Sequence, residues 1–118
     1  MIKFAAPAPR FSSGQLVRHR RYGYRGVVVA LDRACQAPDS WYERNQSRPE
    51  RNQAWYHVLV DQASHSGQGG GAITYAAESS LLPAETFQPI DHPLVLQYFS
   101  EFDGRCYRRN DRTWTGTW

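Results

Sequence analysis

The stretch from Gly14 to Asp32, GQLVRHRRYGYRGVVVALD, constrains the fold more than any other part of the chain. Two short apolar runs, Leu16–Val17 and Val27–Leu31, flank a segment that contains two glycines. The β-branched valines favour an extended, pleated backbone, and glycine permits the tight reversal that joins two strands. The sequence therefore predicts a β-hairpin with a basic and aromatic bend, which is exposed and available for contacts.

A second clear strand is AWYHVLVD, residues 54–61. Side chains on a strand alternate between its two faces, and the face of Tyr56, Val58 and Val60 is uniformly apolar. We expect that face to lie against the core and the other face to form the outside or rim of the sheet. The expected outer residues are Trp55, His57, Leu59 and Asp61.

The remaining segments are shorter. Asp39 and Ser40 are placed to cap a helical turn, and apolar residues spaced at three and four positions predict an amphipathic helix that ends at Gly104. A strand at 87–90 is expected to pair back with the first strand. The predicted elements are strands at 14–20, 24–31, 54–61, 72–76 and 87–90, a helical turn at 39–44 and a helix at 94–102.

These elements predict a mainly β fold: a small, partly open five-stranded barrel with a short helical turn and a C-terminal helix or tail. The length of 118 residues suits one domain. We expect a flexible leader at 1–13, the barrel domain at 14–90, and a helix with a basic-aromatic tail at 91–118. The predicted core residues are Val17, Val27, Val29, Tyr56, Val58, Val60, Ile73 and Leu81.

Charge is unevenly distributed along the chain. Residues 1–31 carry six basic side chains and no acidic one, residues 32–104 carry four arginines and ten acids, and residues 105–118 carry four arginines and one aspartate. Such segregation favours binding of a polyanion or an acidic protein surface. The alternative is that folding interleaves these segments and evens out the field.

Several classes of protein are disfavoured. No apolar run approaches the roughly 20 residues of a membrane span, and the N-terminal residues lack the apolar region of a secretory signal. We therefore expect a cytoplasmic protein without a membrane partner. Cys35 and Cys106 are far apart in the sequence and are expected to be free thiols.

Catalytic and metal sites are not predicted. His57 and Asp61 would lie about 13 Å apart on one strand, at roughly 3.3 Å per residue, too far to form a base and its orienting acid. The glycine-rich stretch 62–71 lacks P-loop spacing and precedes a strand. The histidines and cysteines lack the close pairs typical of zinc sites, so we expect His57 to be a structural rim residue and no cofactor or metal to be bound.

Four segments, taken in order, carry a family resemblance. GQLVRH, GYRGVV, AWYHVLVD and ITYAAESSL lie between residues 14 and 82 and together resemble the YccV-like, hemimethylated-DNA-binding family of bacterial heat-shock proteins, the HspQ family. The resemblance implies a small SH3-like barrel and a homo-oligomer. It also implies binding of hemimethylated double-stranded DNA or, alternatively, a role as adaptor, specificity enhancer and substrate of a cytoplasmic ATP-dependent protease.

The basic hairpin is the candidate DNA-binding surface, because phosphates attract cations and exposed bases stack on aromatic rings. A location near the nucleoid would follow from that reading. The alternative is that Arg18 and Arg20 lie on the solvated face and only keep the barrel soluble. A further alternative is that Glu78 or Asp61 on the partner strand neutralises them. The candidate DNA-binding residues are Arg18, His19, Arg20, Arg21, Tyr22, Tyr24 and Arg25. The residues of a possible binding rim are Trp55, His57, Tyr75 and Glu78.

Overall fold

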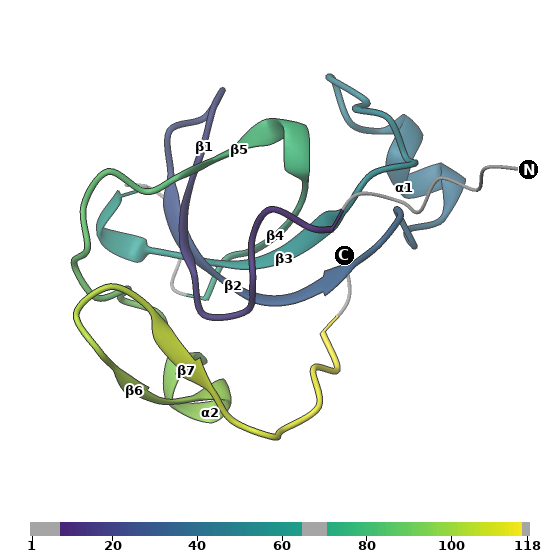
Figure 1. Cartoon of the computed structure of the whole chain (residues 1–118). Coiled ribbons are helices and arrows are strands. Elements are labelled where there is room, and N and C mark those ends of the chain that lie inside the picture. Colours follow the sequence, from purple (N-terminus) through teal and green to yellow (C-terminus); the bar gives the residue numbers. More distant parts are fainter. Residues whose placement is uncertain (1–7, 65–70, 117–118) are drawn as a thin grey trace, which may run out of the picture.

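A computed structural model of the chain describes residues 8–64 and 71–116. Its main feature is a curved five-stranded antiparallel sheet with strand order β4-β3-β2-β1-β5 (Figure 1). Because β4 and β5 are both edge strands, the barrel is not closed. The strands are β1 (Leu16–His19), β2 (Arg25–Asp32), β3 (Trp55–Val60), β4 (Ile73–Ala77) and β5 (Leu81–Pro83).

A second, two-stranded sheet follows at the C-terminal end, formed by β6 and β7. None of the helices in the described residues is long and apolar enough to cross a membrane. The remaining elements are α1 (Asp39–Glu43), the 3₁₀ turns η1 (Gln62–Ser64) and η2 (Glu78–Ser80), α2 (Val95–Tyr98), β6 (Phe99–Phe102) and β7 (Tyr107–Arg109).

The predicted mainly β, partly open barrel is confirmed, including the first hairpin. β1 pairs with β2 in the register Leu16 to Val27. The predicted helical turn is present as α1, although Pro38 occupies the N-cap position and no side chain caps the turn. The glycine-rich stretch 62–71 falls mostly outside the described residues, which resume at Gly71.

The sheet is buried on both faces, which the sequence did not predict. One apolar cluster lies inside the curve of the sheet and includes Val17, Val28 and Tyr56. The other lies on the opposite face, where Val27 and Val29 pack against the C-terminal segment. Seven of the eight predicted core residues are buried, but on two faces, and Ile73 is exposed.

The expectation of an outer or rim face on β3 is therefore wrong. Trp55, His57, Leu59 and Asp61 are all at most 4% exposed. The physical reason is that other segments of the chain pack on this face of the sheet. Side chains of the α1 region pack around Trp55, and Leu59 belongs to the same apolar cluster as residues of α2, β6 and β7.

The strand that returns to β1 also differs from the prediction. Residues 87–90 form no strand, whereas Leu81–Pro83, which lie outside the predicted strands, pair with β1 as β5. The 3₁₀ turn at Glu78–Ser80 reverses the chain immediately after β4. The reversal brings the apolar Leu81 beside β1, where it is fully buried.

The predicted helix over 94–102 is wrong beyond its first turn. The chain is helical only at Val95–Tyr98, and Phe99–Phe102 form β6, paired with β7. Gly104, with φ +96°, lies in the turn between these strands instead of ending a helix. Asp103 Oδ1 accepts the N–H groups of Arg105 and Cys106 in that turn, so local hydrogen bonds favour a hairpin over a longer helix.

Candidate DNA-contact surface

The tip of the first hairpin, residues 19–24, is a hydrogen-bonded loop. The His19 N–H donates to Tyr24 O at 2.9 Å, and the Gly23 N–H donates to His19 O at 3.0 Å. Gly23 has φ +75°, a conformation that favours glycine. The Arg20 N–H donates to Ser80 O, which ties the tip to η2. The tip therefore presents its exposed side chains from a fixed backbone.

His19 organises this loop from within. Its Nδ1 accepts the backbone N–H groups of Arg21 and Tyr22, each at 3.1 Å. Its ring stacks between Tyr22, at 4.7 Å, and Tyr24, at 5.0 Å. Burial, and secondly the charge of Arg21, lower the pKa of His19 below its usual value. His19 is thus a neutral scaffold residue rather than an exposed cation.

Tyr24 and Arg25 also face into the structure. The Tyr24 hydroxyl is 2.7 Å from Thr74 Oγ1, and burial raises the pKa of Tyr24 to about 12. Arg25 forms an ion pair with the buried Asp61 at 2.9 Å. Among the described residues, Asp61 therefore neutralises Arg25 and not Arg18 or Arg20, the arginines with which the alternative interpretation paired it.

Three of the seven candidate residues form the exposed part of the tip: Arg20, Arg21 and Tyr22. The Arg21 guanidinium lies 5.7 Å from the centre of the Tyr22 ring. No ion pair is recorded for Arg20 or Arg21 within residues 8–64 and 71–116. Arg18 lies beside the tip and pairs with the exposed Glu85 at 3.4 Å. The structure therefore leaves two adjacent arginines for an external anion.

The predicted rim residues do not surround this tip as an exposed border. Trp55 is buried and its Nε1 donates to Glu50 O. Asp32 Oδ2 accepts the Tyr75 hydroxyl at 2.6 Å and lies 3.4 Å from His57 Nε2. These contacts belong to an internal cluster beneath α1.

Glu78 has a similar internal role. Its Oε1 accepts both the Tyr56 hydroxyl and the Arg10 N–H, each at 2.7 Å. It therefore pins the N-terminal segment to β3 rather than neutralising the hairpin. Phe11 continues this contact: it is buried, and its N–H donates to the Tyr56 hydroxyl.

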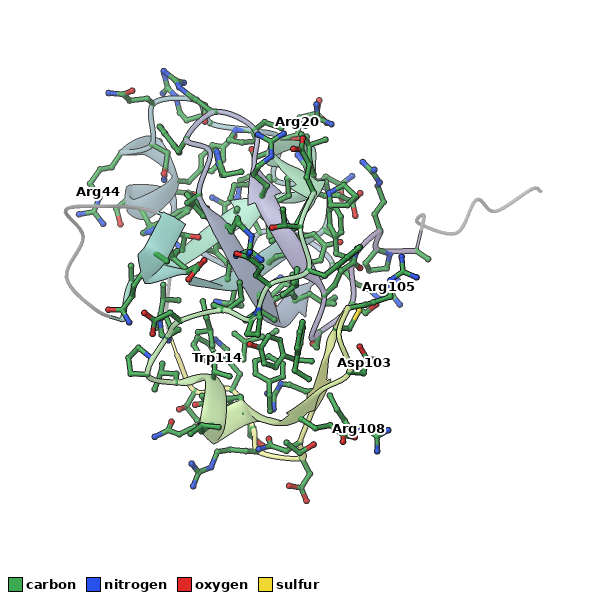
Figure 2. All side chains as sticks on the ribbon, turned by 90° about the vertical axis from the view of Figure 1, so that its left-hand side faces the viewer. Arg20, Arg44, Asp103, Arg105, Arg108 and Trp114 are labelled. Atoms are coloured by element: carbon green, nitrogen blue, oxygen red, sulfur yellow. The ribbon has the colours of Figure 1, made fainter. Side chains whose placement is uncertain are left out.

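The arginines outside the hairpin are dispersed. In Figure 2, Arg20 lies at one end of the molecule, Arg108 at the opposite end, and Arg44 and Arg105 on different sides. Arg109 is tied to backbone carbonyls, including Val29 O at 2.9 Å. These labelled arginines therefore do not gather on one face with the hairpin tip.

The buried histidines predict a stability that falls in mild acid. Burial is the main cause that lowers the pKa values of His19, His57 and His92 below 6.5. His92 Nδ1, like that of His19, accepts a backbone N–H, here from Leu94. Because the unfolded chain binds protons more readily, the stabilisation present above about pH 6.5 is lost as the pH falls through the folded-state pKa values.

Urea unfolding measured between about pH 7.5 and pH 5 checks this expectation. The free energy of unfolding should fall steadily below about pH 6.5, and His19→Gln should reduce the steepness of the fall. A free energy of unfolding that stays constant across this range would contradict the neutral, buried state of these rings.

Comparisons with known proteins identify the family to which this chain is similar. A family model described as "Hemimethylated DNA-binding protein YccV like" matches residues 9–106. F-box only protein 21 from Homo sapiens is 35% identical over 103 residues, as is the protein of the same name from Mus musculus. The match covers 85% of this chain but only 15% of each of those proteins.

Proposed function

The chain belongs to the YccV-like family of hemimethylated-DNA-binding proteins, and from that membership we propose that it is a non-catalytic module that binds double-stranded DNA through the hairpin tip. The observation that supports this surface is the adjacent pair Arg20 and Arg21, which are exposed and lack an acidic partner in the described structure. Arginine is suited to phosphate because its planar guanidinium offers several donors in a fixed fork.

The hairpin tip is also suited to DNA binding because its backbone conformation is fixed before binding. The two N–H groups held by His19 fix the backbone that carries both arginines, so little backbone entropy is lost on binding. Tyr22, 55% exposed beside them, is available to pack on a sugar or base. Phosphate contacts carry most of the affinity in this proposal, and they carry no sequence information themselves.

A preference for hemimethylated DNA is the finer part of the proposal and is supported by the family description alone. The test is a titration of the full chain against matched unmethylated, hemimethylated and fully methylated duplexes at two salt concentrations. We expect all three to bind more weakly at high salt, with the hemimethylated duplex bound most tightly at both. Equal affinities for the three duplexes would contradict the methylation preference. Absence of binding at low salt would contradict the proposal that the chain binds DNA.

A second candidate function is that of a cytoplasmic adaptor or specificity enhancer for an ATP-dependent protease, as a homo-oligomer. The observation that favours it is the dispersal of the exposed arginines, since a dedicated DNA-binding face usually concentrates its charge (Figure 2). A degradation assay with a purified protease and client separates the two functions. Faster client degradation that persists after loss of Arg20 and Arg21 would favour the adaptor.

A further inference from the structure

A groove of about 260 Å³ lies between the hairpin tip and the loop that follows α1. Its floor is β4, an edge strand of the sheet. Its lining combines aromatic rings from four separate segments of the chain with polar side chains, among them Asn45, Gln46 and Thr74. The main lining residues are Tyr22, Tyr24, Trp41, Pro49, Trp55 and Tyr75.

The rings of the floor are held by one another. Trp55 and Tyr75 lie 5.3 Å apart, and Trp41 packs edge-on against both, at 6.1 and 5.6 Å. The Tyr24 hydroxyl is bonded to Thr74 on β4. Because these contacts already exist in the isolated chain, the groove is preformed and binding costs little side-chain entropy.

The lining indicates an uncharged occupant at the centre of the groove. No Asp, Glu, Lys or Arg is among the lining residues in the described part of the chain, and the one histidine, His19, is held neutral by its two backbone donors. The volume lies just below the roughly 300–1,000 Å³ of sites for drug-sized molecules. It suits one or two side chains of an extended segment. Aromatic-lined grooves of this kind accept proline, whose rigid backbone is already ordered before binding.

The two ends of the groove differ in charge. On the hairpin side stand Arg20 and Arg21, beyond the exposed Tyr22. On the other side, Arg51 is paired with Asp39 at 3.4 Å. The rest of that loop is balanced, with Arg44 and Arg48 against Glu43 and Glu50. Only the hairpin end carries a net positive charge, so an acidic group is favoured at that end alone.

We infer that this groove binds an extended, proline-containing segment of a partner protein, with an acidic residue directed at the hairpin tip. A duplex meets the tip with its phosphates but does not cover the accessible apolar residues of the groove. These are Tyr22, 55% exposed, Ile73, 37% exposed, and the half-buried Trp41. A proline or aliphatic side chain packs on them, and removal of that apolar surface from water drives binding. The inference is independent of DNA binding, although both ligands would use the same two arginines.

The test is fluorescence anisotropy with the full chain and three labelled peptides that share a proline-rich core and carry aspartate, serine or arginine flanks. We expect the acidic peptide to bind tightest and the basic one weakest. Tyr22→Ala should weaken binding of the acidic and neutral peptides by about tenfold or more, since aromatic side chains dominate such contacts. Joint replacement of Arg20 and Arg21 by alanine should lower the affinity of the acidic peptide to that of the neutral one.

Phe87→Ala is the matched control, because Phe87 is a similarly exposed ring, at 47%, that contacts Arg105 away from the groove. It should leave all three affinities unchanged, and thermal unfolding confirms that each variant is folded. Lack of saturable peptide binding up to about 1 mM would overturn the inference. So would equal weakening by Phe87→Ala. Binding of a single-stranded oligonucleotide that depends on Tyr22, without peptide binding, would assign the groove to an unstacked base instead.

Discussion

Replacement of Asp61 by alanine is expected to lower the free energy of unfolding by about 3–5 kcal/mol, because it leaves the charge of Arg25 in a largely buried site without its carboxylate. The two groups are 2.9 Å apart, with 3% of the Asp61 side chain and 15% of the Arg25 side chain exposed. Asp61 Oδ1 also accepts the backbone N–H groups of Ala63 and Asp91. Loss of the carboxylate therefore also leaves these two backbone N–H donors without an acceptor.

The same ion pair joins parts of the chain that are distant in sequence. The second nitrogen of the Arg25 guanidinium donates to Gln88 O at 2.7 Å, so the pair links β2 and the end of β3 to the segment before α2. Urea unfolding at neutral pH measures the effect. Glu85→Ala is the matched control, because it removes the exposed pair of Glu85 with Arg18 and should cost at most about 1 kcal/mol.

A combined Arg25→Met and Asp61→Leu variant separates the cost of an unpaired charge from the value of the pair. If the cost of Asp61→Ala comes from the stranded charge, the double variant should recover part of the lost stability. An Asp61→Ala variant as stable as the Glu85→Ala control would contradict the structural role assigned to this pair.

Joint replacement of Arg20 and Arg21 by alanine is expected to weaken DNA binding by about tenfold or more per arginine. A hydrogen bond to a charged group contributes about 1.5–3 kcal/mol, and each 1.4 kcal/mol is tenfold in affinity. The loss should be similar for unmethylated, hemimethylated and fully methylated duplexes, because phosphates are common to all three. The melting temperature should barely change, since both side chains are exposed.

The control is joint replacement of Arg105 and Arg108 by alanine, which removes the same charge far from the tip (Figure 2). Binding is measured by fluorescence anisotropy of labelled duplexes. Equal losses in the two double variants would indicate a general effect of net charge. Losses that differ strongly between methylation states would place Arg20 or Arg21 at a base edge instead of a phosphate.

The strands were predictable where alternation and turn chemistry were strong. β1, β2 and β3 follow from valine-rich runs and from glycines at the bend, which are local signals. The C-terminal part was not predictable in this way. The spacing of Leu94, Tyr98 and Phe102 suits a helix, but pairing with Tyr107–Arg109 converts its second half to β6. That pairing depends on a turn whose hydrogen bonds come from Asp103.

The burial of both sheet faces could not be predicted from the sequence for a related reason. A strand with one apolar and one mixed face normally indicates a half-exposed sheet. Here His57 and Asp61 lie on the mixed face, and their burial beneath the covering segments is tolerated because Asp32 and Arg25 lie beside them. Both partners come from β2, so spacing within β3 does not reveal them.

The location of the candidate site was predictable, but the separate roles of its residues were not. The basic hairpin stood out in the sequence, yet only the fold separates the exposed Arg20 and Arg21 from the inward-facing His19, Tyr24 and Arg25. A histidine two residues before an arginine gives no sign that its Nδ1 accepts that residue's N–H. The groove beside the tip was equally hidden, because its rings come from four separate segments.

The most direct test of the proposed DNA surface is the salt dependence of binding to one duplex, compared between the unchanged chain and the variant in which Arg20 and Arg21 are alanine. Each arginine that neutralises a phosphate releases condensed counterions, which adds about 0.9 to the slope of log K against log salt. We predict that the slope becomes shallower by about 1.8 in the variant. An unchanged slope would contradict the assignment of DNA contact to the hairpin tip.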